Sequence, residues 1–389
     1  MKHFVSMRDF SNEELNDLFD LADRLCDFSA IDVETVIGIV NDFVTERGIG
    51  GIMRPGQIMA SMFYEPSTRT RLSFEAAMHR LGGKVIGFSD VRTTSVAKGE
   101  TLADTVRIVN GYADVLVIRN PWEGSALVAA LHSQAPVINA GDGGREHPTQ
   151  CLVDLFTLRR EKGRIEGLRV GLLGDLKFGR TVHSLAQGLA RFGAEVVCIS
   201  PEPLRMPRRV LDFVEQLTGR RPAEVAQPEE VLDQLDALYV TRIQRERFDD
   251  PAEYEALKGC YVVTSAMMRN ARADTIVLHP LPRVDEIAPE FDSDPRAAYF
   301  RQAHYGVPTR MALLGIMLAR AEAEEKWEPD WPEDARCVVS QKRLCDNPRC
   351  VTAFEPHLEF RLERLDDGQL RCVYCDALVE QRELKLEAK

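Results

Sequence analysis

Residues Ser67-Thr68-Arg69-Thr70-Arg71 follow an apolar run and a proline, at a point where a strand is predicted to give way to a helix. The first turn of such a helix carries unpaired backbone N–H groups and a dipole that favours anions. The hydroxyl groups can donate hydrogen bonds to phosphate oxygens, and a guanidinium can meet an anion in bidentate geometry. The stretch therefore predicts a phosphate cradle, for which a Ser/Thr helix cap with exposed arginines is the alternative. Because no Lys follows a GxxxxG, the loop is not that of an ATPase or GTPase.

The length and composition of the chain predict a globular protein of two or three domains. It has 389 residues, of which 44% are hydrophobic and 28% charged, so it can bury sizeable cores. The net charge of -12 argues against non-specific binding of nucleic acid, so the arginines of the cradle need a specific anionic ligand. No apolar stretch approaches the length of a transmembrane helix, and the N-terminus lacks the apolar core of a signal peptide. We therefore expect a cytoplasmic protein that does not bind membranes.

Two series of alternating strand and helix patterns predict two α/β domains with parallel sheets. The first series has strand patterns at 58–63, 85–88, 115–118 and 137–139, and helix patterns at 11–28, 71–81 and 101–112. The second has strand patterns at 169–173, 195–200, 237–241, 260–264 and 276–279, and a helix pattern at 180–192. Open parallel sheets bind ligands at the carboxyl ends of their strands. The cradle, Arg119 and residues 141–150 all follow predicted strands. The glycines at 171, 174 and 179 lack the GxGxxG spacing, which argues against a dinucleotide site.

Two further segments could complete an anion site. A glycine-rich turn leads to His147 and Gln150 at the start of a predicted helix. A His in that position tends to stay neutral and can donate an N–H to a carbonyl oxygen, although a capping His is the alternative. Residues 94–101 form a polar loop that offers Ser95 and Lys98 to a phosphate, but a solvated surface loop has the same composition.

Arginines in the second series favour a substrate with two carboxylates. Arg180 begins a predicted helix, and Arg242 follows a predicted strand together with Gln244. Two guanidiniums at the ligand-binding edge of one sheet suit a dicarboxylate. A single arginine would by default form a surface salt bridge, so only the pair supports this interpretation.

Four motifs, taken in order, resemble the signatures of aspartate carbamoyltransferase catalytic chains. They are Ser67-Thr68-Arg69-Thr70-Arg71, His147-Pro148-Thr149-Gln150, residues 174–184 and His279-Pro280-Leu281-Pro282-Arg283. The resemblance runs from about Val5 to about Leu318, and residues 241–244 share it. The related ornithine carbamoyltransferases share the first motif and His-Pro-x-Gln, but they have His-Cys-Leu-Pro where this chain has His-Pro-Leu-Pro.

The resemblance implies a role for each matching residue. Carbamoyl phosphate would be bound by Ser67, Thr68, Arg69, Thr70, Arg119, His147 and Gln150, and by Ser95 and Lys98 of a neighbouring subunit. That sharing implies a homotrimer. Catalysis would depend on Arg69, Thr70, Lys98, Arg119 and His147, of which Thr70, Arg119 and His147 polarise the carbamoyl oxygen. L-Aspartate would be bound by Lys98, Arg180, Arg242 and Gln244 and by the backbone of Pro280 and Leu281.

The resemblance implies transfer of the carbamoyl group to the α-amine of L-aspartate, giving N-carbamoyl-L-aspartate and phosphate. This is an early step of de novo pyrimidine biosynthesis, and it needs no metal in the active site. A carbamoyltransferase for another amine and a non-catalytic assembly scaffold are the alternatives. The retention of the arginines at 69, 119, 180 and 242 together with His147 opposes the scaffold.

Four cysteines near the end of the sequence have the spacing of metal ligands. Four residues separate Cys345 from Cys350, and two separate Cys372 from Cys375. Such pairs can form the tetrahedron of thiolates that structural zinc requires, and disulfides are the alternative. A closed site would also supply folding energy to a segment too small for a secure core.

The same segment resembles the zinc domain of the aspartate carbamoyltransferase regulatory chain, which in the family docks on the catalytic chain. No segment corresponds to the nucleotide-binding domain of that chain. We therefore expect a catalytic chain fused to a docking module without its own allosteric site. A higher assembly through the zinc domain is left open.

The predicted fold is thus two parallel-sheet α/β domains of carbamoyltransferase type plus a small four-cysteine zinc-binding β-rich domain. We expect a carbamoyl phosphate-binding domain at 1–148, completed by a C-terminal helix at about 307–325, and an aspartate-binding domain at 149–306. A linker at 326–337 would lead to the zinc-binding domain at 338–389.

Overall fold

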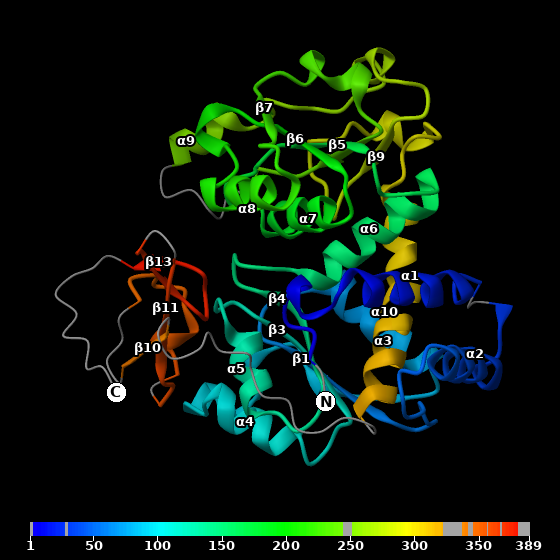
Figure 1. The fold of residues 1–389 in the computed structure, drawn as a ribbon, viewed down its shortest axis with the longest axis vertical. Coiled ribbons are helices and arrows are strands. Elements are labelled where there is room, and N and C mark those ends of the chain that lie inside the picture. The colour runs from blue at the N-terminus through cyan, green and yellow to red at the C-terminus, as the bar shows by residue number, and fades with distance from the viewer. Residues whose placement is uncertain are drawn as a thin grey trace. The chain divides into compact units, whose positions relative to one another are not determined.

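The structure, a computed structural model, describes residues 3–27, 30–243, 251–321, 337–340, 345–355, 357–365 and 368–379. The chain divides into two compact units, each with its own parallel sheet (Figure 1). The first unit comprises Met1–Phe10, Asp17–His147 and Arg310–Lys389, and the second comprises Ser11–Asn16 and Pro148–Thr309. The predicted linker falls almost entirely outside the described residues.

The sheet of the first unit has four parallel strands in the order β2-β1-β3-β4. They are β1 (Ile58–Phe63), β2 (Lys84–Phe88), β3 (Val115–Asn120) and β4 (Val137–Asp142). The strands β1, β3 and β4 are almost wholly buried, whereas β2 lies at an edge and is largely exposed. The apolar runs predicted all four strands, and for β1, β3 and β4 the reason is that strands buried on both faces are nearly continuous in hydrophobic residues.

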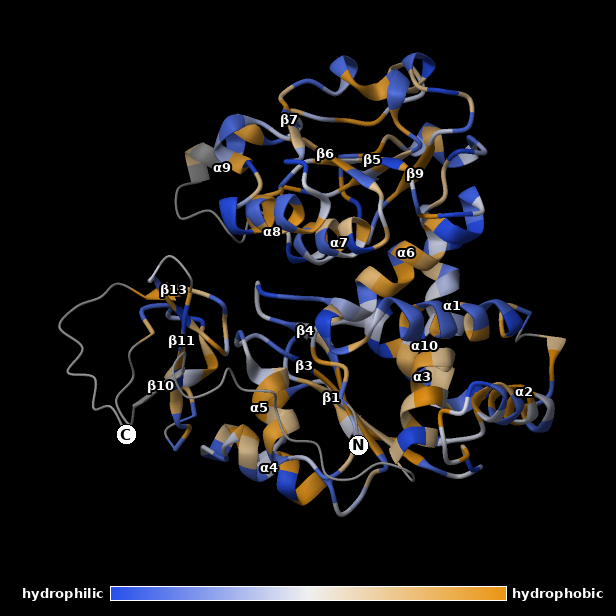
Figure 2. Cartoon of the chain, viewed as in Figure 1, coloured by the Kyte–Doolittle hydropathy of each residue, from blue (hydrophilic) through white to orange (hydrophobic). Residues whose placement is uncertain are grey.

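The helices of the first unit are α2 (Val33–Glu46), α3 (Thr68–Arg80), α4 (Leu102–Val109), α5 (Ser125–His132) and part of α1 (Asn12–Arg24) and α10 (Tyr299–Ala321). In Figure 2, α5 and α10 are largely hydrophobic. Helix α10 packs closely on α2, since a Cβ at Gly315 would lie 2.8 Å from Cγ1 of Val40. It is tied to α3 by a hydrogen bond of 3.2 Å from Nη1 of Arg310 to Oγ of Ser73.

Helix α10 starts eight residues before the predicted start at 307. In the structure Pro308 lies inside the helix. The residues after Ala321, where the helix was predicted to continue, lie outside the described part of the chain.

The second unit has a five-stranded parallel sheet in the order β7-β6-β5-β8-β9. The strands are β5 (Arg169–Leu173), β6 (Glu195–Ile199), β7 (Ala223–Val225), β8 (Ala237–Val240) and β9 (Ile276–Leu278). The helices described wholly in this unit are α6 (Pro148–Lys162), α7 (Arg180–Arg191), α8 (Arg208–Thr218) and α9 (Pro251–Leu257). The short edge strand β7 was not predicted, because Ala-Glu-Val contains no apolar run.

The strand predicted at 260–264 is wrong. Only Val263 forms a bridge, and its partner is Ile287 rather than a strand of the sheet. The N–H of Val263 donates to Glu286 O at 2.9 Å, and the N–H of Ala288 donates to Val263 O at 3.0 Å. Cys260 is exposed, so the apolar pattern of the segment does not reflect a buried strand.

Burial of His183 on α7 predicts a pH-dependent contribution to stability. Its Nε2 lies 2.8 Å from Leu176 O, and burial, followed by the charge of Arg209, lowers its pKa from 6.5 to about 4. Since the folded-state pKa lies below the unfolded value, the unfolded chain gains a proton first as the pH falls through this window. This difference in proton uptake should lower the free energy of unfolding by about 1.4 kcal/mol for each pH unit of acidification within the window.

The variant His183→Gln keeps an N–H donor but does not titrate. Denaturant unfolding between pH 6.5 and pH 4.5 should therefore show a shallower loss of stability on acidification in this variant than in the wild type. Equal slopes would show that His183 makes no such contribution.

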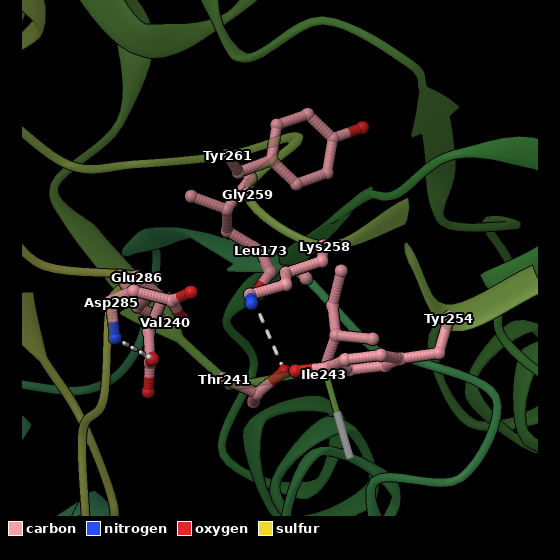
Figure 3. Close-up of a pocket in the computed structure, with 11 residues that line it drawn as sticks. Leu173, Val240, Thr241, Ile243, Tyr254, Lys258, Gly259, Tyr261, Asp285 and Glu286 are labelled. Carbon is pink, nitrogen blue, oxygen red and sulfur yellow. Dashed lines mark hydrogen bonds between the residues drawn. The ribbon is translucent and has the colours of Figure 1, made fainter. Parts of the chain in front are cut away.

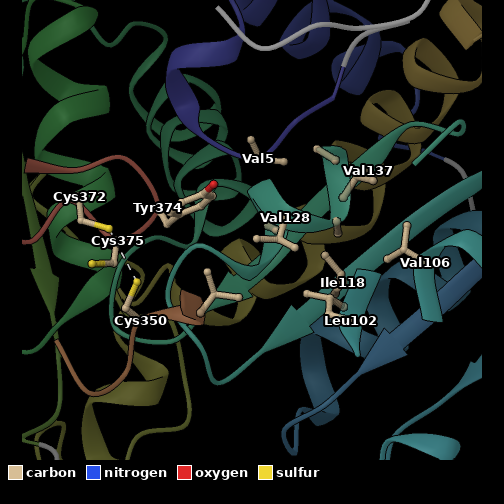
Figure 4. Close-up of a cluster of buried hydrophobic side chains, with 14 of the residues drawn as sticks. Val5, Leu102, Val106, Ile118, Val128, Val137, Cys350, Cys372, Tyr374 and Cys375 are labelled. Atoms are coloured by element: carbon tan, nitrogen blue, oxygen red, sulfur yellow. Dashed lines mark hydrogen bonds between the residues drawn. The ribbon is translucent and has the colours of Figure 1, made fainter. Parts of the chain in front are cut away.

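The C-terminal module, by which we mean the described residues from Cys337 to Val379, is an antiparallel sheet. Its strands follow the order β10 (Cys337–Ser340), β11 (Phe360–Arg364), β12 (Leu370–Cys372) and β13 (Leu378–Val379). It shares one continuous hydrophobic core with the first unit, to which Tyr374 and Val128 both belong (Figure 4). The module is therefore packed on the first unit of its own chain.

No helix within the described ranges combines the length and the apolar character that crossing a membrane requires.

Candidate active site

The N-terminus of α3 carries the predicted phosphate cradle. Ser67 is the N-cap residue, with an extended backbone (φ -156°, ψ 105°), but its side chain makes no capping hydrogen bond. Thr70 is buried in the first turn. Nε of Arg71 lies 3.7 Å from Glu75 along the helix, whereas Arg69 forms no hydrogen bond or ion pair with any residue the structure describes. Desolvation lowers the pKa of Arg69, although a guanidinium stays charged in proteins. The Ser67 hydroxyl and the Arg69 guanidinium are thus available to a ligand.

Arg119 lies beside this cradle because β3 pairs with β1. Phe63 is its partner in the register, and the N–H of Tyr64 donates to Arg119 O at 2.8 Å. Nε of Arg119 donates to Oε1 of Glu65 at 2.7 Å, with both side chains mostly buried. An anion that binds Arg119 must therefore compete with Glu65. Sequence reasoning missed this partner, although the position of Glu65 two residues beyond β1 was a usable signal.

His147 is buried at the end of a turn that follows β4. The buried carboxylate of Asp142 organises this turn, since it accepts hydrogen bonds from the N–H of Glu146 at 3.1 Å and of Gly124 at 3.0 Å. Burial raises the pKa of Asp142 to about 7. The backbone closes the turn a second time, as the N–H of Asp142 donates to Glu146 O at 3.2 Å. His147 therefore follows a turn that is fixed at both ends.

Gln150, in the first turn of α6, is held by a buried carboxylate that the sequence did not reveal. Nε2 of Gln150 donates to Oδ1 of Asp154 at 2.7 Å. Asp154 also accepts from Nε2 of Gln302 at 2.6 Å and from Tyr239 OH at 2.9 Å. The amide of Gln302 in turn accepts the N–H of His279 at 2.9 Å. One carboxylate thus joins Gln150 to β8, α10 and the end of β9.

The predicted acceptor residues follow neighbouring strands of the second sheet. Arg180 begins α7 after β5, Arg242 follows β8, and Pro280 and Leu281 follow β9. Because β5, β8 and β9 are adjacent and parallel, their carboxyl ends share one edge. Gln244, the remaining predicted residue of this group, lies outside the described residues.

His279 fixes the backbone after β9. The N–H of Leu281 donates to Nδ1 of His279 at 2.7 Å, so the ring proton lies on Nε2, which is 2.7 Å from Oε1 of Glu286. Burial opposes ionisation of Glu286, but its hydrogen bond with His279 brings the net pKa below the usual range. The segment that would line the acceptor site is therefore rigidly held.

A pocket opens at the carboxyl ends of β5 and β8 (Figure 3). Its lining includes both chain neighbours of Arg242, together with Lys258 and Glu286. The lining does not include Arg180, Pro280 or Leu281. Arg242 itself is not among the lining residues either, so the pocket marks only the strand ends that the predicted acceptor residues follow.

No hydrogen bond or ion pair joins Ser95 or Lys98 to the cradle within the described part of the chain. Both belong to a short 3-10 helix (Ser95–Lys98) and are exposed. Neither side chain forms a hydrogen bond or ion pair with another described residue. Their exposure leaves them able to contact another molecule.

The four terminal cysteines form a closed cluster of buried thiols. Their sulfur atoms all lie within 4.8 Å of one another, with Cys345 and Cys375 3.5 Å apart and Cys350 and Cys372 3.8 Å apart. A tetrahedral metal with bonds of about 2.3 Å to sulfur places neighbouring sulfurs about 3.8 Å apart. A disulfide would need a sulfur–sulfur distance of about 2 Å, and all four cysteines are free. The cluster therefore fits a structural metal ion.

The family descriptions that match the chain cover most of its length. The aspartate/ornithine carbamoyltransferase carbamoyl-P binding domain matches residues 2–160, and the Asp/Orn binding domain of that family matches residues 166–317. The metal binding domain of the aspartate carbamoyltransferase regulatory chain matches residues 343–385.

Individual relatives and solved structures agree with these matches. The chain is 52% identical over 318 residues to an aspartate carbamoyltransferase catalytic subunit of Thermococcus onnurineus, covering 82% of this chain and 97% of the relative. The solved catalytic subunit of M. jannaschii aspartate transcarbamoylase is 44% identical, with a TM-score of 0.71, over 83% of this chain and all of the other. An aspartate transcarbamoylase of Trypanosoma cruzi in complex with N-(phosphonacetyl)-L-aspartic acid is 39% identical, with a TM-score of 0.68, over 80% and 94%. The chain therefore belongs to the aspartate carbamoyltransferase family, with a regulatory-chain metal-binding domain fused at its C-terminus.

Proposed function

We propose that this enzyme transfers the carbamoyl group of carbamoyl phosphate to the α-amine of L-aspartate, releasing N-carbamoyl-L-aspartate and phosphate. The observation that carries the proposal is the N-terminus of α3, where Ser67 does not cap the helix and Arg69 has no partner among the described residues, beside Arg119 at the end of β3. The first unit binds carbamoyl phosphate in this cradle. The reaction belongs early in de novo pyrimidine biosynthesis, and we expect it to take place in the cytoplasm.

The transfer proceeds by addition and elimination without a covalent enzyme intermediate. The uncharged amine attacks the carbonyl carbon, and the resulting oxyanion is stabilised by donors from Thr70, Arg119 and His147. The bond between this carbon and the phosphate oxygen then breaks, the phosphate departs with the electron pair, and it takes up the proton that the amine loses. Arg69 offsets the charge that develops on the departing phosphate. Gln150 contacts the carbamoyl amine, which can donate to its Oε1 while Nε2 stays bonded to Asp154.

The second unit binds L-aspartate by contacting the two carboxylates of this substrate. Arg180 and Arg242 supply guanidiniums at the shared strand edge, and Gln244 belongs to the same set by sequence. The backbone of Pro280 and Leu281 lines the site, held in place by His279. An acceptor that carries a second, positively charged amine in place of the second carboxylate would be repelled by the same pair of guanidiniums.

We propose that the active enzyme is a homotrimer in which active sites are shared. The support is the exposure of Ser95 and Lys98, whose side chains form no hydrogen bond or ion pair with the described residues of their own chain. In the assembly these residues reach the cradle of a neighbouring subunit, where Lys98 contacts both substrates. Trimers can pair further through the C-terminal module.

We infer that the metal of the module is Zn²⁺. Four buried thiolates with sulfur atoms at tetrahedral spacing are typical of structural zinc. Cys345, Cys350, Cys372 and Cys375 would hold it and leave no open position for a substrate. The metal therefore contributes folding energy to the module, not chemistry to the transfer.

The proposal is tested by incubating the purified chain with carbamoyl phosphate and L-aspartate. Mass spectrometry should detect N-carbamoyl-L-aspartate in amounts equal to the phosphate released, and His147→Ala should lose most of the rate. Absence of product from the folded, metal-loaded chain would instead favour the non-catalytic scaffold.

A further inference from the structure

The turn that presents His147 is bonded to the C-terminal module of the same chain. We propose that the module positions this turn for catalysis, through Asp376 and Asn347, so that Asp376 is a positioning residue of the active site. The inference rests on the proposed function only for its catalytic consequence. The contacts that carry it all lie within the first unit.

The first link is an ion pair at the base of the turn. Arg145, within the turn, is only 8% exposed, and its Nε lies 2.7 Å from Oδ2 of Asp376. Its Nη1 and Nη2 lie 3.6 Å from Asp142 and 3.7 Å from Glu146. A buried guanidinium needs both charge compensation and hydrogen bonds, and removing one partner is costly. Asp376 makes the shortest of these contacts, so it fixes where Arg145 sits among the carboxylates.

The second link runs through Glu123. Its Oε2 accepts a hydrogen bond of 2.8 Å from Nδ2 of Asn347 in the module, and its Oε1 accepts one of 3.3 Å from the N–H of Gly144 in the turn. The backbone of Glu123 also pairs with the module, donating to Arg349 O and accepting from Val351 N–H, both at 2.9 Å. The module therefore holds the turn at two residues, Gly144 and Arg145.

The backbone packing leaves little freedom between the module and the turn. Gly124 has φ 89°, and a Cβ there would lie 2.5 Å from Tyr374 O, so only glycine allows this approach. The same Gly124 donates its N–H to Asp142. Nearby, the rings of Trp122 and Phe354 stack with centroids 3.4 Å apart. Movement of the module would therefore be transmitted to the carboxylate that organises the turn.

The turn passes this constraint to His147. Glu146 precedes His147 directly, and its carboxylate accepts a hydrogen bond of 3.0 Å from Oγ of Ser6. If Arg145 loses Asp376, its guanidinium must be satisfied by Asp142 and Glu146, which changes the bonds that set the turn. A misplacement of about 1 Å at a catalytic group can reduce the rate about 100-fold.

The test compares Asp376→Asn with a matched control, Glu359→Gln. Both changes remove one negative charge from the module, but Glu359 is 57% exposed and pairs with Arg361. Both variants should retain the metal content of the wild type. In Asp376→Asn we expect kcat to fall about 10- to 100-fold, with a smaller change in KM for aspartate. Hydrogen exchange at the amides of residues 142–147 should become faster in this variant and stay unchanged in the control.

A second variant, Arg145→Gln, leaves every residue of the module intact. It keeps the inference testable if Asp376→Asn fails to fold. The two changes remove the same contact, so the double variant should lose no more activity than the worse single variant. Unchanged kcat and unchanged exchange at 142–147 in a metal-loaded Asp376→Asn would overturn the inference while leaving the proposed function intact. If the wild type itself lacked carbamoyl transfer, the proposed function would fail, and the exchange measurement would still decide whether the module holds the turn.

Discussion

Replacing Arg69 with Ala is expected to lower kcat by about 10²- to 10³-fold while weakening carbamoyl phosphate binding much less. Charge on the departing phosphate peaks after the ground state, so a guanidinium that meets it contributes mainly to the transition state. Arg69 has no partner among the described residues. Its removal therefore leaves no protein carboxylate unpaired. The loss in rate can then be attributed to the lost contact between the guanidinium and the substrate.

Steady-state kinetics and equilibrium binding of carbamoyl phosphate, measured on the same preparations, separate the two effects. Arg80→Ala, in the last turn of α3, removes a charge from the other end of the same helix and should leave both quantities close to those of the wild type. Equal losses in kcat and in affinity would sink the assignment of Arg69 to the leaving group.

Replacing Cys350 with Ser should abolish metal binding and unfold the C-terminal module. The four sulfurs are buried and mutually close, so an alcohol at one corner leaves an incomplete site. Structural zinc sites contribute about 10–16 kcal/mol of binding energy at neutral pH, and small modules depend on it for folding. Because the module shares a core with the first unit, its loss should also destabilise that unit.

Metal content per chain and thermal unfolding measure this outcome. Cys260→Ser is the matched control, since that thiol is free, exposed and outside the cluster. It should keep one metal ion per chain and an unchanged unfolding temperature. A Cys350→Ser variant that still bound one equivalent of metal would contradict the four-thiolate site.

The sequence predicted the fold well where local pattern determines it. Strands β1 and β5 were predicted with their observed bounds, because buried parallel strands form apolar runs between turn residues. The segment 260–264 has a similar pattern but pairs with a loop. Whether such a segment joins the sheet or pairs with a loop depends on tertiary contacts. Strand β7 is too short and too exposed to leave a pattern.

In the candidate site, too, local sequence pattern predicts some features, whereas only tertiary contacts determine others. The residues at strand ends and helix starts could be proposed from position, as Arg119 and Arg242 show. Their partners could not, because Glu65 meets Arg119 only through strand register, and Asp154 meets Gln302 across 148 residues of sequence. The contact of Asp376 with Arg145 spans 231 residues and depends on how the module packs. Such partners follow from the folded structure, not from motif spacing.

The most direct test of carbamoyl transfer to aspartate is the ratio of kcat/KM for L-aspartate to that for L-ornithine, measured at saturating carbamoyl phosphate. Arg180 and Arg242 should bind the second carboxylate of aspartate and repel the second ammonium of ornithine. We predict rapid formation of N-carbamoyl-L-aspartate and no measurable carbamoylation of ornithine. Activity with ornithine but not with aspartate would contradict the account.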